Sequence, residues 1–127
     1  MMRVCSILMS INPKYVEKIL SGNKKYEYRK IKARNKNVNK IVIYATFPVM
    51  KIVAEVNIEE ILEDSPRILW EKTKKYSGVT KDFFEKYYDK KKTAVAYKLG
   101  KVTKYDKPME LKDFGISCAP QSFIYLS

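Results

Sequence analysis

Two strand-length apolar segments follow each other with only a short turn between them, and this spacing restricts the fold most strongly. Residues 40–46 are a nearly continuous apolar run that Pro48 ends, and residues 52–59 alternate between apolar and polar side chains. A short turn can join antiparallel strands, whereas parallel strands need a long crossover. The pair therefore predicts a hairpin and argues against a regular array of strand–helix–strand units.

Cap residues predict three short helices between further strands. Asn12-Pro13 and Ser65-Pro66 each combine a helix cap with a proline suited to the first turn, and Thr80 caps a third helix. The other predicted strands cover residues 7–11, 25–29, 93–105 (with a bend or bulge at Gly100) and 123–126, and a turn is expected at residues 107–108. We expect one α+β domain over residues 1–127, with a curled, partly closed sheet of five or six strands and about three short helices.

Positive charge is concentrated in one part of the chain. The net charge is +12, and residues 14–40 hold ten of the 26 lysines and arginines but only two acids. This stretch predicts a face that binds phosphate groups, although a solvated lysine-rich surface has the same composition. A second cluster at residues 90–92 is interpreted as a solvated loop.

The absence of histidine removes several kinds of chemistry. Imidazole bases, Ser-His-Asp triads and histidine-ligated zinc are all excluded. No P-loop, nucleophile elbow or metal-ligand spacing occurs either, so the sequence indicates no cofactor and no metal site. Whether the protein is an enzyme stays open at this point.

The cysteines and the short apolar runs favour a cytoplasmic protein. Cys5 and Cys118 form no CxxC motif and are expected to be reduced thiols, with a bridge between them as the alternative. No apolar run approaches the roughly 20 residues that cross a bilayer, and no signal peptide is evident at the start of the sequence. A membrane partner is therefore not expected.

The segment with the most chemical content reads Gly-x-Lys-x-x-Glu-x-Arg at residues 22–29. Gly22 allows a sharp turn after the first helix, and Glu27 and Arg29 project from one face of a strand about 7 Å apart. Together with Lys24 they could bind a polar ligand, the cations through phosphate and Glu27 through a base amino group. A surface ion pair without a ligand is the alternative.

This segment resembles the signature of the ASCH domain, a relative of the PUA RNA-binding domains with a small mixed β-barrel. The resemblance extends over nearly the whole chain, at residues 10–13, 19–22, 43–48, 69–70, 77–79 and 119–123. It implies a cleft between the barrel and the helices, with RNA or a nucleotide-like molecule as ligand and a regulator of transcription or translation as one role. One branch of the family hydrolyses acylated cytidine, and another is a metal-dependent ribonuclease, so either activity is the alternative function.

Carried over by residue, the resemblance makes Lys24 the signature lysine. Glu27 stands where the hydrolytic branch has a threonine nucleophile, and Glu55 is the candidate for a second carboxylate in the cleft. As an enzyme, the protein would use Lys24, Glu27 and Glu55, with the two carboxylates as acid and base or as joint ligands of a divalent metal. As a binding protein it would use the signature residues, a stacking tyrosine and the cleft edge: Gly22, Lys24, Lys25, Glu27, Arg29, Tyr44, Gln121 and Ser122, with Tyr26 and Tyr28 as further stacking candidates or as core residues.

Overall fold

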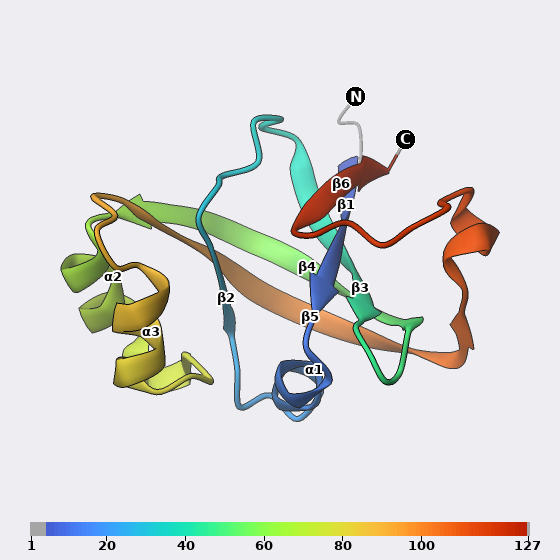
Figure 1. Ribbon diagram of the computed structural model, residues 1–127, viewed down its shortest axis with the longest axis horizontal. Helices are drawn as coiled ribbons and strands as arrows, with labels where there is room; N and C mark the ends of the chain where they lie inside the picture. Colours follow the sequence, from blue (N-terminus) through green and yellow to red (C-terminus); the bar gives the residue numbers. More distant parts are fainter. Residues whose placement is uncertain (1–4, 127) are drawn as a thin grey trace.

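The computed structural model, which describes residues 5–126, contains one six-stranded sheet (Figure 1). The strands are β1 (Cys5–Ile11), β2 (Tyr26–Arg29), β3 (Val38–Ala45), β4 (Lys51–Asp64), β5 (Ala94–Met109) and β6 (Phe123–Leu126). Their order is β2-β5-β4-β3-β1-β6, with β1 and β3 parallel and the other pairs antiparallel. The predicted α+β class with a curled sheet is confirmed.

The predicted hairpin is formed by β3 and β4. Ile41 pairs with Val56 and Ile43 with Ala54, so the two apolar faces coincide. The long strands β4 and β5 then run antiparallel across the molecule (Figure 1). The turn predicted at residues 107–108 is wrong, because β5 continues to Met109, which pairs with Ile52.

Gly100 lies at an irregular part of β5, as its position in the sequence predicts. The β4–β5 register shifts between Ile58 and Glu60, opposite Leu99. A Cβ atom on Gly100 would lie 2.9 Å from Cγ of Glu59, so a larger residue here would displace the exposed Glu59 side chain.

The helices begin where the capping residues predict. They are α1 (Pro13–Leu20), α2 (Pro66–Thr73) and α3 (Lys81–Tyr87), with short 3₁₀ turns η1 (Lys74–Tyr76) and η2 (Leu111–Phe114). The side chains of Asn12, Ser65 and Thr80 accept hydrogen bonds from the backbone N–H groups of Lys14, Ile68 and Phe83. Each cap thus satisfies one of the free donors of the first turn.

Three apolar clusters hold these elements together. The first lies between the sheet and α1 and includes Ile7, Val16 and Ile43. The second joins α2 and α3 to β2 and β5 through residues such as Leu69 and Phe84. The third packs η2 against Leu8, Val42, Tyr44 and Ile52. As a result, α1 and α3 both lie beside β2, which is the edge strand that carries the signature residues (Figure 1).

Cys5 and Cys118 are both free thiols. Across residues 5–126, no helix combines the length and apolar character that crossing a membrane requires.

Candidate functional site

The turn after α1 directs the signature residues toward the helices. Gly22 has φ of +84°, and the N–H groups of Asn23 and Lys24 both donate to the carbonyl of Lys18, which closes the helix end. The chain then enters β2, where Glu27 pairs with Tyr97 and Arg29 with Val95 on β5.

Lys24 is buried, with only 2% of its surface exposed. Its Nζ atom donates to the carbonyl of Ser77 at 2.6 Å and lies 3.8 Å from Oε1 of Glu27. The rings of Tyr28 and Tyr15 lie 5.1 and 5.4 Å from the same Nζ. Burial lowers the pKa of the Lys24 ammonium, and the negative charge of Glu27 opposes that shift only in part.

Gly78 lets the chain pass directly over the Lys24 side chain. Its φ is +71°, and a Cβ atom at this position would lie 2.6 Å from Cγ of Lys24. Gly78 therefore closes the site above Lys24.

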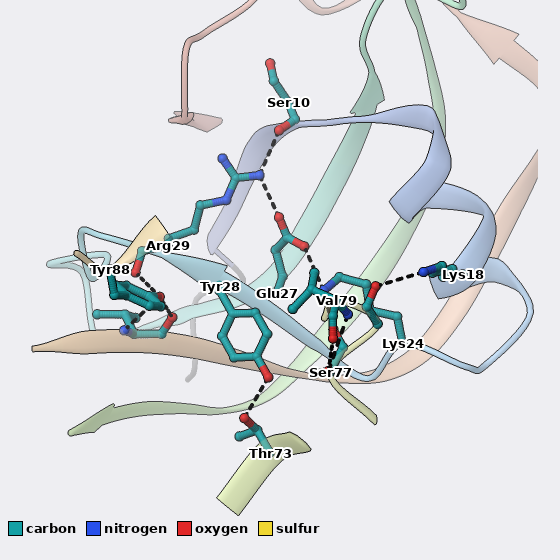
Figure 2. A network of polar contacts seen from close by, with 12 residues as sticks. Ser10, Lys18, Lys24, Glu27, Tyr28, Arg29, Thr73, Ser77, Val79 and Tyr88 are labelled. Carbon is teal, nitrogen blue, oxygen red and sulfur yellow. Dashed lines mark hydrogen bonds and ion pairs between the residues drawn. The ribbon is translucent and has the colours of Figure 1, made fainter. Parts of the chain in front are cut away.

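Glu27 and Arg29 form a nearly buried ion pair. Nη2 of Arg29 donates to Oε2 of Glu27 at 2.7 Å and to the carbonyl of Ser10 at 2.7 Å (Figure 2). Nε of Arg29 is buried and makes no hydrogen bond. Glu27 lies between two cations, Lys24 and Arg29. The formal charge of the three side chains together is therefore +1.

These side chains line one cavity that is open to solvent. Its volume is about 190 Å³, and its walls are Ile11, Asn12, Tyr15, Lys24, Glu27, Tyr28, Arg29, Val79, Phe83 and Tyr87. Four of the wall residues are aromatic, and the rings of Phe83 and Tyr87 are stacked with centroids 6.2 Å apart. The signature residues therefore meet in a hollow with an aromatic wall, and Glu27 and Arg29 do not form a solvated surface pair.

The predicted pairing of Glu55 with Glu27 in one cleft does not form. Glu55 lies on β4, where Oε2 is 2.8 Å from Nζ of Lys40 and Oε1 accepts from Tyr105 at 2.9 Å. The hydrogen bond from Lys40, followed by that from Tyr105, lowers the pKa of the Glu55 carboxyl. Its polar partners thus hold it away from the cavity, and the acid–base or metal-binding pair of carboxylates is not present.

Other predicted site residues lie outside the cavity wall. Tyr44 is buried in the third apolar cluster, where it cannot stack on a ligand. Gly22 has open space around it, and Lys25 is exposed with its Nζ 4.4 Å from the ring centre of Tyr76. Gln121 is exposed.

Ser122 lies on a segment that borders the site without lining its wall. The carbonyl of Ser122 accepts from the N–H of Ser10, and the hydroxyl of Ser10 donates to the carbonyl of Pro120. The carbonyl of Ser10 in turn accepts a hydrogen bond from Nη2 of Arg29. The segment that contains Ser122 thus supports the end of β1, whose Ser10 carbonyl binds the Arg29 side chain.

The core interpretation of the β2 tyrosines is confirmed. Tyr26 and Tyr28 pack on the second apolar cluster, and the Tyr28 hydroxyl is hydrogen-bonded to Thr73 at 2.6 Å. Burial raises the pKa of Tyr28 to about 12. Tyr28 also contributes part of its surface to the cavity.

Sequence reasoning missed three aromatic wall residues. Tyr15 on α1 and Phe83 and Tyr87 on α3 line the cavity. The i, i+4 spacing of Phe83 and Tyr87, offset by one residue from Phe84 and Tyr88, is the signal that separates two faces of this helix.

Comparisons with known proteins agree with this architecture. The family model of a domain of unknown function, DUF365, matches residues 4–121. The crystal structure of ASCH from Zymomonas mobilis has a TM-score of 0.86 and 24% identity, over 96% of this chain and 87% of that one. A tyrosine-to-phenylalanine mutant of that protein gives 0.86 and 22% identity, over 96% and 90%. The predicted ASCH fold is confirmed.

Two curated relatives come from Ureaplasma parvum serovar 3. The ATP synthase subunit alpha is 31% identical over 123 residues, which cover 95% of this chain and 15% of that protein. The large ribosomal subunit protein uL22 is 29% identical over 122 residues, which cover 95% of this chain and 39% of that protein. The chain thus spans well under half the length of both relatives.

Proposed function

Since the chain belongs to the DUF365 domain family, and since it has the ASCH fold, we propose that it is an RNA- or nucleotide-binding protein. Its ligand enters the cavity formed by Lys24, Glu27 and Arg29. Regulation of transcription or translation through this binding, and a cytoplasmic location, are parts of the same proposal.

The observation that carries the proposal is the meeting of two buried charged side chains, Lys24 and Glu27, and the partly buried Arg29 in an open cavity. Lys24 and Arg29 exceed Glu27 by one positive charge, and Nε of Arg29 has no partner. Two cations around a single carboxylate leave a site in which an anionic acceptor would be stabilised by charge. A phosphate or a carbonyl group has this chemistry, and Arg–phosphate contacts are among the stronger hydrogen bonds.

The size and the walls of the cavity favour one nucleotide unit. Pockets for whole drug-sized ligands are about 300–1,000 Å³, whereas this cavity is about 190 Å³. The smaller volume matches a single nucleotide of which the base and part of the phosphate group enter the cavity. Tyr15, Phe83 and Tyr87 offer aromatic faces, and stacking of a base on such a face contributes about 1–3 kcal/mol.

The curated relatives give a limited indication of an RNA context. One of them is named as a large ribosomal subunit protein, and this chain matches 39% of it. The other is named as an ATP synthase subunit, and there the match covers 15%. We therefore rest the proposal on the cavity rather than on these names.

The proposal is tested by the affinity for a fluorescently labelled single-stranded RNA, measured by anisotropy at low salt. Lys24→Met combined with Arg29→Met keeps the apolar stems and removes both charges. We expect this variant to bind about a hundredfold more weakly or worse, since it loses two charge-assisted contacts and each costs about 1.5–3 kcal/mol.

The matched control removes two charges elsewhere. Lys101→Ala combined with Lys104→Ala changes exposed side chains on β5. Arg29→Met alone serves as the milder variant should the loss of buried Lys24 impair folding, which circular dichroism reports. Equal affinity of the site variant and the control would contradict the site assignment.

A second candidate function is hydrolysis of an acylated cytidine, and the environment of Lys24 favours it. Burial lowers the pKa of this lysine, which increases the fraction of neutral amine able to accept a proton. The carboxylate of Glu27 lies 3.8 Å away but has no hydroxyl for an acyl intermediate. The test is the release of cytidine from acylated cytidine. If the wild type releases cytidine and Glu27→Gln does not, hydrolysis becomes the first candidate function.

The donor set of the cavity does not fit a divalent cation. Of the residues that line it, only Glu27 is acidic, and its two oxygens face Arg29 and Lys24. Divalent cations that bind oxygen need several such donors. A metal-dependent ribonuclease at this site is therefore not proposed.

A further inference from the structure

Helix α3 separates the cavity from a second and larger hollow. At 100° per residue, Phe83 and Tyr87 lie on one side of the helix and Phe84 and Tyr88 on another. The first pair lines the cavity, and the second pair lines a groove with residues of α2. Helices α2 and α3 lie next to each other in the fold (Figure 1). The volume of this groove is about 750 Å³, within the range of ligand sites.

The floor of the groove is aromatic. Trp70 on α2 is partly exposed, and its ring lies 4.9 Å from that of Phe84. Phe84 is only 3% exposed, so the indole rests on a buried ring, and Tyr88, also 3% exposed, packs on Phe84 with ring centres 4.8 Å apart. An indole ring held in this way offers a flat surface for stacking a base.

The rim of the groove carries positive charge that other side chains do not neutralise. Lys81 lies 3.9 Å from Glu85, and Glu71 pairs with Lys74 at 2.7 Å. By contrast, the structure shows no ion pair within residues 5–126 for four other rim cations, which are Arg67, Lys90, Lys91 and Lys92. Asp89 is the remaining acid on the rim, so the groove fits an anionic partner.

The backbone of Lys90 and Lys91 forms the turn that follows α3. Lys90 has φ of +62°, and the N–H of Lys91 donates to the carbonyl of Tyr88 at 2.9 Å. From the sequence this cluster is interpreted as a solvated loop. In the structure its lysines also line the groove.

Contacts across α3 link the groove to the cavity. The hydroxyl of Tyr88 donates to the carbonyl of Arg29 at 2.8 Å, and Nζ of Lys30 lies 4.7 Å from the ring centre of Tyr87. The two hollows are therefore about one helix diameter apart, roughly 10 Å. A polyanionic strand bound at one of them passes within reach of the other.

We propose that the groove between α2 and α3 binds the part of a single-stranded RNA that flanks the nucleotide in the cavity. One base stacks on Trp70, and Lys90, Lys91 and Lys92 contact the phosphates around it. This inference rests on the proposed function and adds a second subsite to it.

The experiment uses Trp70, the single tryptophan of the chain, as the reporter. An oligouridine octamer is titrated into the full-length protein, and both the tryptophan emission and the salt dependence of the affinity are recorded. We expect the octamer to quench the emission, whereas uridine monophosphate, which reaches only the cavity, leaves it nearly unchanged.

The test variant is Lys90→Ser/Lys91→Ser/Lys92→Ser, and the matched control is Lys101→Ser/Lys104→Ser/Lys107→Ser. Both triples remove three exposed charges. Each phosphate contact contributes about 0.7 to the slope of log affinity against log salt for single strands, so the test variant should lose about 2 from that slope. It should also lose most of the quenching, and the control should lose neither.

Several results would overturn the inference. Octamer binding without a change in emission is one, and equal behaviour of the two triple variants is another. Quenching by an oligo-aspartate but not by the octamer would assign the groove to an acidic protein segment instead.

The proposed function is tested separately by the octamer affinity of Lys24→Met/Arg29→Met. Octamer binding that depends on Lys90–Lys92 but not on the cavity residues would contradict the cavity and support the groove. Octamer binding that depends on the cavity residues alone would support the cavity and contradict the groove.

Discussion

Replacing Gly78 with alanine should destabilise the protein through its contact with the buried Lys24. The new Cβ would lie 2.6 Å from Cγ and 2.7 Å from Cβ and Cδ of Lys24, where real Cβ atoms do not approach. Overpacking of this kind costs about 1–3 kcal/mol, and the left-handed backbone adds about 1 kcal/mol. We therefore expect the free energy of unfolding to fall by about 2–4 kcal/mol.

Gly22→Ala provides the matched control for this measurement. Gly22 also has a left-handed backbone, with φ of +84°, but nothing lies within 4 Å of the position of its Cβ. This variant should lose only about 1 kcal/mol from the backbone. Urea unfolding followed by circular dichroism measures both differences.

The difference between the two variants isolates the packing over Lys24. For a chain of this length, about 1 kcal/mol corresponds to roughly 4 °C in Tm, so Gly78→Ala should melt about 4–12 °C below Gly22→Ala. If the two alanine variants were equally stable, Lys24 would not lie beneath Gly78, and the description of a buried lysine would be refuted.

Three further predictions concern the surroundings of the cavity. Thr73→Val removes the hydrogen-bond partner of the buried Tyr28 hydroxyl, so it should lower the free energy of unfolding in urea by about 1–3 kcal/mol, and an unchanged stability would contradict this bond. Because burial lowers the pKa of Lys24, the unfolded chain holds more protons between the lowered pKa and the usual value of about 10.4. The free energy of unfolding of the wild type should therefore rise with pH in that window relative to Lys24→Met, and parallel pH profiles would contradict the shift. Glu55→Gln should leave RNA affinity nearly unchanged by anisotropy, because Glu55 pairs with Lys40 outside the cavity, and a large loss would show that Glu55 acts on the ligand.

Local signals in the sequence predict the start of each helix and the position of the signature residues. Asn12, Ser65 and Thr80 cap their helices because a side-chain oxygen next to a free N–H needs no tertiary partner. The order Gly22, Lys24, Glu27 likewise follows from a helix end that leads directly into a strand. These features depend on neighbours within a few residues, so the sequence contains the necessary information.

Features that depend on distant partners could not be read in the same way. The assignment of Glu55 to the cleft failed because its direction depends on the pairing of β4 with β3 and on Lys40 and Tyr105. The proline at position 108 suggested a turn, but β5 continues because its pairing with β4 extends to Met109. The burial of Lys24 depends on Ser77 and Gly78, more than fifty residues away along the chain.

The central claim is that the guanidinium of Arg29 receives an anionic nucleotide ligand in the cavity, and nuclear magnetic resonance tests it most directly. The Nε–H signal of Arg29, assigned by its loss in Arg29→Met, is followed while uridine monophosphate is added. Because the Arg29 side chain lines the cavity, we expect this signal to shift as the ligand binds, whereas that of Arg34, which is not part of the cavity wall, stays in place. Saturable binding of the nucleotide with an unmoved Arg29 signal would contradict the account.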